Sequence, residues 1–298
     1  MCDSTACDHA SPEAVRTIPV WMPAPNGPLR GVQIRERGLF GPHWDGTRVA
    51  FVPGVSGAKE DFVPLMEELV ATGRHRLFAL DQCGQNETPG VDDPAAYTLP
   101  SLADDLAVAI TAVCARKPVH LVGQGAGALV AASAVALSVG RRVAHPSRYV
   151  SLTLLSPVWE GVAKAAGLGC CDREGLAAAQ HRGGVLDPAR RQVVQQRLAR
   201  SHPVSLRQLA TATAHADLAA QVRAAGVPVL VVRGEEDRLV DDAAGEELAR
   251  ALDAEYRVVP EAGHLTYHDN PAQLGRMLLD FWDGLGENTA RSAAWLAH

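Results

Sequence analysis

Short apolar segments typical of buried β-strands alternate with helical segments along most of this 298-residue chain. Such alternation favours a mostly parallel sheet with helices on both faces. The segment Pro23–Pro28 separates the first two apolar stretches and is typical of an antiparallel hairpin turn. We therefore predict one α/β core with an eight-stranded, mostly parallel sheet. Its strands are expected at 17–22, 31–36, 48–53, 76–81, 118–123, 149–156, 227–233 and 256–259.

Helices are expected between these strands, and one long interruption divides the pattern. Core helices are predicted at 59–72, 101–116, 126–139, 241–253 and 271–282, with Ser101 and Asp104 forming a capping-box-like start of the second. From Trp159 to Gly226 the sequence predicts only helical segments, at 173–182, 188–201 and 206–225. The predicted organisation is a flexible N-terminus (1–16), a core in two parts (17–157 and 227–285), a helical lid between them (158–226) and a tail (286–298).

Composition narrows the classes of partner. The chain has 28 Lys and Arg residues against 34 Asp and Glu residues, a net charge of −6, which does not favour binding to nucleic acid or an anionic membrane. The first residues lack the apolar core of a secretory signal, and Ala126–Val139 is too short to span a bilayer. The six cysteines have no zinc-ligand spacing. We expect a cytoplasmic, cofactor-free and metal-free protein that acts on a small molecule as a monomer or homodimer.

The segment Val119–Ala128, VHLVGQGAGA, is a strand, a turn and a helix with two interpretations. Gly123, Gly125 and Ala128 fit a dinucleotide-binding fingerprint. That fingerprint normally opens its fold, whereas more than a hundred residues precede it here. The predicted strand 149–156 also lacks the acidic residue that would hold a ribose. These features favour the second interpretation, a sharp strand-to-helix turn of the G-x-S-x-G type with glycine in place of serine.

Further motifs follow other predicted strands. Asp237 comes just after the strand 227–233, and His264 follows the next strand in Pro260–His264. Turn, acid and histidine occur in the order of the Ser, Asp and His residues of the α/β-hydrolase superfamily, which the chain resembles. Phe51–Gly57 resembles the superfamily's oxyanion loop, and Asp81–Gln85 resembles its D-x-x-G-x-G segment. The resemblance implies an α/β-hydrolase fold with a lid at 158–226.

The departures from the superfamily pattern concern the chemistry itself. Gly125 stands where the superfamily has its nucleophile, so acyl-enzyme chemistry has no attacking group there. Pro53 and Gln124 stand where the superfamily often has histidines. The amides of Val55 and Ala126 are still expected to form an oxyanion hole. We predict that Gly125, Gln124, Ser56, Cys83 and Trp159 border the substrate pocket, with Ser56 and Cys83 as less favoured alternative nucleophiles.

These residues suggest a reaction that needs a base and no nucleophile. An imidazole exchanges protons near neutral pH, so His264, oriented by Asp237, is predicted to be a general base. The main hypothesis is a lyase that performs β-elimination. Relatives that lost the serine suggest acetate elimination from an acylated polyketide or tetronate in bacterial natural-product biosynthesis. The two alternatives are a hydrolase that activates water directly and a non-catalytic ligand-binding protein.

Overall fold

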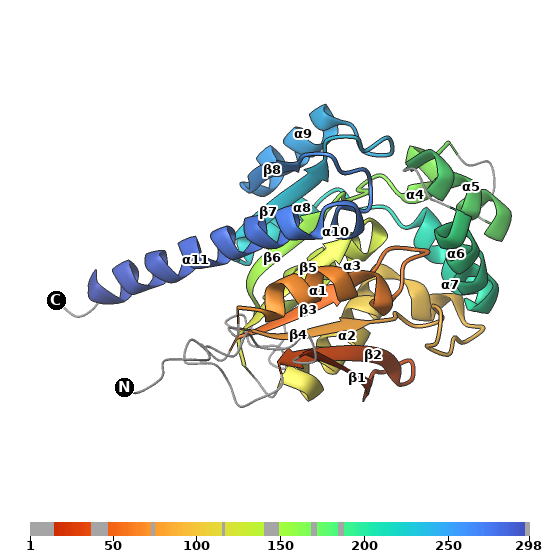
Figure 1. The fold of residues 1–298 in the computed structure, drawn as a ribbon, viewed down its shortest axis with the longest axis horizontal. Coiled ribbons are helices and arrows are strands. Elements are labelled where there is room, and N and C mark those ends of the chain that lie inside the picture. The colour runs from red at the N-terminus through yellow and green to blue at the C-terminus, as the bar shows by residue number, and fades with distance from the viewer. Residues whose placement is uncertain are drawn as a thin grey trace, which may run out of the picture.

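A computed structural model describes residues 15–36, 47–72, 75–114, 117–139, 149–167, 172–183 and 188–295. Its sheet has eight strands in the order β1-β2-β4-β3-β5-β6-β7-β8, as Figure 1 shows. β1 pairs antiparallel with β2 and β2 with β4, whereas all other pairs are parallel, which confirms the predicted sheet. The strands are β1 (Val15–Met22), β2 (Leu29–Glu36), β3 (Arg48–Val52), β4 (Arg76–Leu80), β5 (Val119–Gln124), β6 (Tyr149–Leu155), β7 (Val229–Gly234) and β8 (Glu255–Val259).

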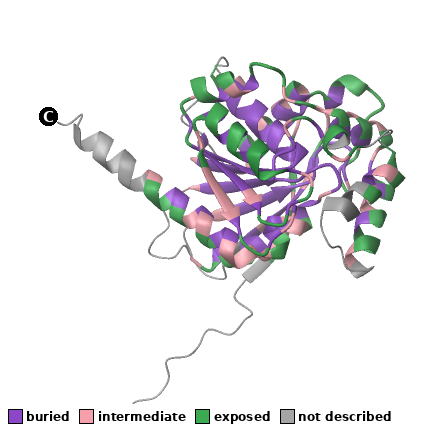
Figure 2. Cartoon of the chain, turned by 90° about the horizontal axis from the view of Figure 1, so that it is seen from above, coloured by how far each residue is buried: buried purple, intermediate pink, exposed green. Residues whose placement is uncertain are grey.

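Helices cover both faces of this sheet and form two hydrophobic cores. One core includes residues of α2, α3, α8 and α9, and the other includes residues of η2, α1, α10 and α11. Figure 2 shows the buried strands between these layers. The elements are η2 (Lys59–Phe62), α1 (Val63–Val70), η3 (Pro94–Tyr97), α2 (Leu99–Cys114), α3 (Ala126–Ser138), α8 (Leu218–Ala224), α9 (Asp242–Leu252), α10 (Thr266–Asp269) and α11 (Pro271–Trp295).

The predicted lid is helical and lies at one end of the sheet, beyond the carboxyl ends of the parallel strands (Figure 1). It contains α4 (Val162–Ala165), α5 (Arg173–Gly183), α6 (Pro188–Arg200) and α7 (Pro203–Thr211). Specific bonds fix it to the core: Arg197 of α6 pairs with Asp61 of η2 at 2.6 Å, and the His202 amide donates to the Gly84 carbonyl at 2.7 Å. The lid therefore contacts the loop that follows β4.

Two local predictions were wrong. Helix α2 begins at Leu99, before Ser101, and the Thr98 hydroxyl accepts the Ser101 amide at 3.4 Å. The Ser101 hydroxyl instead accepts a hydrogen bond from Asn26 in the β1–β2 turn. The single helix predicted at 206–225 is two helices, α7 and α8, because the chain between them turns toward Trp159, whose carbonyl accepts the Ala214 amide at 2.9 Å.

Other predictions differ in detail or cannot be assessed. The predicted helix 59–72 begins as the 3₁₀ turn η2, and α11 continues beyond the predicted end at Trp282. Cys2, Cys7, Cys170 and Cys171 lie outside the described residues.

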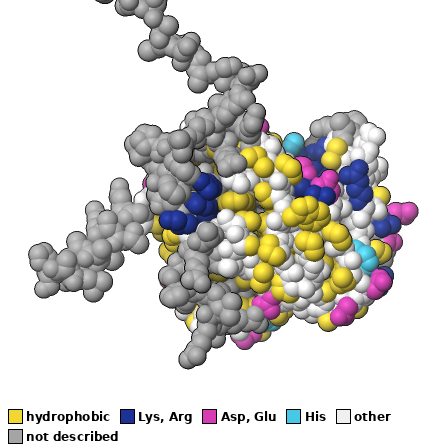
Figure 3. Space-filling model, turned by 90° about the horizontal axis from the view of Figure 1, so that it is seen from below, with side chains coloured by type: hydrophobic (Ala, Val, Ile, Leu, Met, Phe, Trp, Pro, Cys, Tyr) yellow, Lys and Arg dark blue, Asp and Glu magenta, His cyan; other side chains and the backbone are white. Residues whose placement is uncertain are grey.

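On the face seen in Figure 3, hydrophobic side chains occupy much of the middle and charged ones lie mostly toward its edges. Within the described ranges, no helix is both long and apolar enough to cross a membrane.

Candidate functional site

The turn between β5 and α3 places Gly125 at the carboxyl edge of the sheet. Gly125 has φ 54° and ψ −118°, a conformation that glycine adopts without the strain of a side chain. Its amide donates to the Leu155 carbonyl at 3.0 Å, which fixes the turn beside β6. A Cβ built on Gly125 would lie 3.7 Å from Nε2 of His264 and 3.9 Å from Val158. A side chain at residue 125 would therefore lie next to the imidazole of His264.

Asp237 and His264 come together from the loops after β7 and β8. Nδ1 of His264 lies 3.0 Å from Oδ2 and 3.2 Å from Oδ1 of Asp237, and both residues are buried. The two loops are joined because the Glu236 amide donates to the Ala262 carbonyl at 2.8 Å. When Nδ1 carries the ring proton and donates a hydrogen bond to Asp237, Nε2 is left as a proton acceptor.

Several groups hold the Asp237 carboxylate in its ionised form. Oδ1 accepts the amides of Leu239 at 2.8 Å and Val240 at 3.2 Å. Burial alone would raise the pKa of Asp237, but the His264 ring and the Leu239 amide outweigh it and lower that pKa below its usual value. The carboxylate is therefore a fixed negative charge that orients the ring of His264.

Three buried glutamines hold the loop that follows β3. The Gln124 side-chain oxygen accepts the Gly54 amide at 3.2 Å, and the Gln82 amide group donates to the Pro53 carbonyl at 2.8 Å. The Gln85 amide group donates to the carbonyls of Gly54 at 3.0 Å and Val55 at 3.1 Å. Hydrogen bonds to both the amide and the carbonyl groups of its backbone thus hold the loop after β3 in place.

This arrangement leaves two backbone donors near Gly125. Among the described residues, neither the Val55 amide nor the Ala126 amide donates to a protein acceptor. Ala126 is the first residue of α3, where helix amides lack intrahelical partners and the helix dipole favours negative charge. Pro53, in place of a histidine, cannot donate from its backbone. The arrangement can therefore accept a developing oxyanion.

Sequence reasoning missed Gln82 and Gln85 as residues of this site. Both lie in the segment Asp81–Gln85, whose motif assigns no role to these side-chain amides. The signal was present: two neutral amides in a segment that follows a largely buried strand need partners, and the loop after the adjacent strand β3 supplies them. Their targets depend on loop shape, which the motif does not specify.

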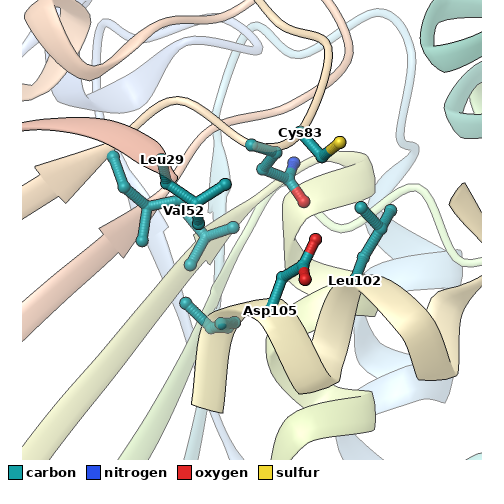
Figure 4. A pocket seen from close by; sticks show the side chains of 8 residues that line it. Leu29, Val52, Cys83, Leu102 and Asp105 are labelled. Carbon is teal, nitrogen blue, oxygen red and sulfur yellow. The ribbon is translucent and has the colours of Figure 1, made fainter. Parts of the chain in front are cut away.

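Cys83, predicted to border the pocket, lines a separate cavity of about 10 Å³ with Leu29, Leu102 and Asp105 (Figure 4). Its Sγ lies 3.8 Å from the Pro89 carbonyl. Burial, together with the charge of Asp105, raises the pKa of Cys83 to about 11, so the thiolate is scarce at neutral pH. This position does not favour Cys83 as a nucleophile.

The remaining predicted pocket residues occupy different places. Ser56 is buried in the β3–η2 loop that also contains Val55. Trp159 lines a cleft of about 500 Å³ beside α9. No group of three or more His, Cys, Asp or Glu side chains within the described ranges is arranged to hold a metal ion.

Asp81, the acidic residue of the segment after β4, has a structural position. It is fully buried and binds Lys59 twice, through Nζ at 2.7 Å and through the backbone amide at 2.8 Å. Burial alone would lower the pKa of Lys59, but Asp81, Glu60 and Glu87 outweigh it and raise that pKa above its usual value. The pair joins β4 to the start of η2.

The alpha/beta hydrolase family model matches residues 49–276, which span most of the chain. The chain belongs to the alpha/beta hydrolase family. No curated protein matches it. Its fold is similar to that of E-2-(acetamidomethylene)succinate hydrolase, with a TM-score of 0.67, 21% identity and coverage of 90% of this chain and 100% of that one.

Two solved esterases also share the alpha/beta hydrolase fold of this chain. Carboxylesterase CesB from Bacillus subtilis has a TM-score of 0.68 and 16% identity, and the match covers 90% of this chain and 92% of that one. Naproxen esterase from Bacillus subtilis has a TM-score of 0.65 and 18% identity, with the same coverage. At these identities the likeness shows the fold alone.

Proposed function

We propose that this family member is an enzyme in which His264 acts as a general base on a carbonyl substrate, without an acyl-enzyme intermediate. The observation that carries the proposal is the 3.7 Å separation between Nε2 of His264 and a Cβ built on Gly125. A base directed at that position, with no side chain in between, can reach a proton on a substrate or on water. The amides of Val55 and Ala126 supply the matching stabilisation of negative charge.

The first candidate reaction is β-elimination. His264 takes the proton from the carbon next to the carbonyl, and the bonding electrons move into the carbonyl to form an enolate at the two amides. The enolate collapses to a carbon–carbon double bond and expels a carboxylate from the β-carbon. The imidazolium then returns its proton to the solvent or to the carboxylate. Acetate as the leaving group, and an acylated polyketide or tetronate as the substrate, belong to this proposal.

Direct hydrolysis is the second candidate, and it is favoured by the esterases that share the fold. A water molecule would take the place of a serine hydroxyl, lose a proton to His264 and attack a carbonyl held by the same amides. Both reactions use the same residues, but their products differ. Their shared dependence on His264 separates them from a protein that only binds a ligand.

Turnover of an acylated substrate in H₂¹⁸O separates these functions. Elimination yields an alkene and a carboxylate that contains no ¹⁸O, whereas hydrolysis through acyl–oxygen cleavage places one ¹⁸O atom in the carboxylate. Mass spectrometry of both products measures the outcome. Turnover that persists unchanged without His264, or no turnover of any acylated substrate, would contradict the proposal.

Gly125→Ser is expected to create a nucleophile where the chain has none. The nearest atoms lie 3.7–4.0 Å from the built Cβ, so the side chain fits, although its positive φ costs about 1–3 kcal/mol of stability. We expect a fluorophosphonate probe to label the introduced serine stoichiometrically, as measured by intact-protein mass spectrometry. Gly125→Ala, which has the same strain and no hydroxyl, should remain unlabelled at this position. A folded Gly125→Ser protein that resists the probe would show that His264 is not directed at this position.

Gln85→Leu is expected to lower kcat on the order of tenfold with little change in KM. The substitution removes the donors to the carbonyls of Gly54 and Val55, so the Val55 amide loses its fixed direction. Steady-state kinetics measures the split between kcat and KM. Gln221→Leu is the matched control, because Gln221 is exposed and its side chain donates to Asp217 on the same surface, far from the loop after β3 in sequence. Equal effects of both variants would contradict a positioning role for Gln85.

A further inference from the structure

A cleft of about 500 Å³ lies between the segment after β6 and helix α9. Its size falls in the range of small-molecule sites in proteins. Helix α9 packs beside β7 and β8, at the top of the view in Figure 1. Its lining includes Val158 and Trp159 after β6, Leu239 and Val240 after β7, and Ala244 and Leu248 of α9.

The cleft shares its walls with the candidate site. Val158 lies 3.9 Å from the Cβ built on Gly125, and its amide is 3.5 Å from the Gly125 carbonyl. Leu239 and Val240 donate their amides to Asp237 and also line the cleft. Val158, Leu239 and Val240 therefore line the cleft and also contact Gly125 or Asp237 of the candidate site.

The charged side chains in the described part of the cleft lining are all acidic. They are Glu160, Asp241 and Glu247, and none of the described lining residues is Lys, Arg or His. Glu160 pairs with Lys164 at 2.5 Å, and Asp241 caps α9 by accepting the Ala244 amide at 2.7 Å. Because Lys164 offsets the charge of Glu160, a carboxylate or phosphate in the cleft would be repelled mainly by Asp241 and Glu247, whereas a neutral or cationic group would not be repelled.

We infer that this cleft binds the part of the substrate that lies away from the reacting carbonyl, and that this part is an apolar chain, uncharged or carrying an amine. The inference rests on the proposed function, because it takes the shared walls as the route between cleft and reacting centre. The apolar side chains supply the affinity, and the acidic rim selects against anionic ends. A free fatty acid or a phosphate-bearing carrier would not be held in this cleft.

Binding can be tested separately from turnover in a His264→Gln background. The probes are decanol, decylammonium and decanoate, which share one chain and differ in charge, titrated by saturation-transfer NMR. We expect decanol and decylammonium to bind at least tenfold more tightly than decanoate. Equal affinities for all three, or a preference for decanoate, would overturn the inference.

Ala244→Trp tests where these probes bind. Ala244 is exposed and lines the cleft, so a tryptophan would obstruct it, and we expect at least a tenfold loss of decanol and decylammonium binding. Ala243→Trp is the matched control, since Ala243 is exposed on the same helix and is not part of the lining. Ala251→Trp, also in the lining, provides a second filled variant if Ala244→Trp does not fold. Unchanged binding in a folded, filled variant would overturn the inference.

Kinetics with His264 intact separates this inference from the proposed function. If acylated substrates with long apolar chains lose at least tenfold in kcat/KM in Ala244→Trp and short ones do not, the cleft is part of the substrate site. Turnover that needs His264 but is unaffected by Ala244→Trp would overturn the cleft assignment alone. Cleft-dependent probe binding in a protein without His264-dependent turnover would contradict the proposed function, and it would reduce the cleft to a ligand site.

Discussion

Replacing His264 with glutamine is expected to reduce kcat/KM by about 10²–10⁴-fold, the usual contribution of a general base. Glutamine fills a similar volume and can hydrogen-bond Asp237, but its amide does not accept a proton at neutral pH. The carbonyl substrate would still bind at the amides of Val55 and Ala126, so we expect most of the loss in kcat. Steady-state kinetics on one acylated substrate, with product identified by mass spectrometry, measures the effect.

The controls change Asp237, which hydrogen-bonds the His264 ring, and a second histidine outside the site. Asp237→Asn should also lower kcat, because an amide in this position favours the wrong tautomer of His264. The double variant His264→Gln/Asp237→Asn should be no worse than His264→Gln alone, since the two residues act as a unit. His268→Gln should have little effect, because His268 is exposed on α10. Additive losses, or a large loss for His268→Gln, would contradict the assigned roles.

The fold could be predicted from the chain because its strongest patterns are local. β5 is buried at all six positions and α3 at almost all, and the sequence of each is nearly continuous in apolar and small residues. Strands at 227–233 and 256–259 likewise placed Asp237 and His264 just beyond strand ends. Because parallel strands end at one edge of the sheet, their proximity followed from topology without knowledge of the loops.

The rest of the site could not be predicted, because it depends on long-range contacts of loops. Gln85 is 31 residues from Gly54, and only the path of the loop after β4 decides which carbonyls its side chain reaches. The break between α7 and α8 depends in the same way on Trp159, far earlier in the chain. Helical propensity continues through 212–217, so no local signal of that break outweighed the periodic pattern.

The side-chain position of Cys83 could not be predicted from the sequence either. The motif placed it beside the candidate site, and its loop does pass there, since neighbouring Gln82 and Gln85 bind the loop after β3. Side chains in such a loop differ in direction, and Cys83 is one of the residues that line the small cavity with Asp105 (Figure 4). The motif therefore does not decide which side chains of its segment face the candidate site.

Lys59→Met is expected to lower the free energy of unfolding by about 3–5 kcal/mol, the usual cost of removing one partner of a buried ion pair. Asp81 has no exposed surface, and burial raises its pKa even beside the lysine. Without Lys59 its carboxyl group would have only the amide of residue 59 and the Asn86 side chain as donors. Glu60 and Glu87 are about half exposed, so water can replace the lysine for them. Urea denaturation at pH 7 measures the loss.

Two further variants show whether the cost comes from the uncompensated charge of Asp81. Lys164→Met removes an exposed lysine that pairs with Glu160, and such pairs contribute at most about 1 kcal/mol, so its effect should be small. In the double variant Lys59→Met/Asp81→Asn the buried charge is gone as well, and we expect it to be more stable than Lys59→Met alone. If the double variant were no more stable than Lys59→Met, the destabilisation would come from lost packing around the Lys59 side chain, and the ion pair would have no special role in joining β4 to η2.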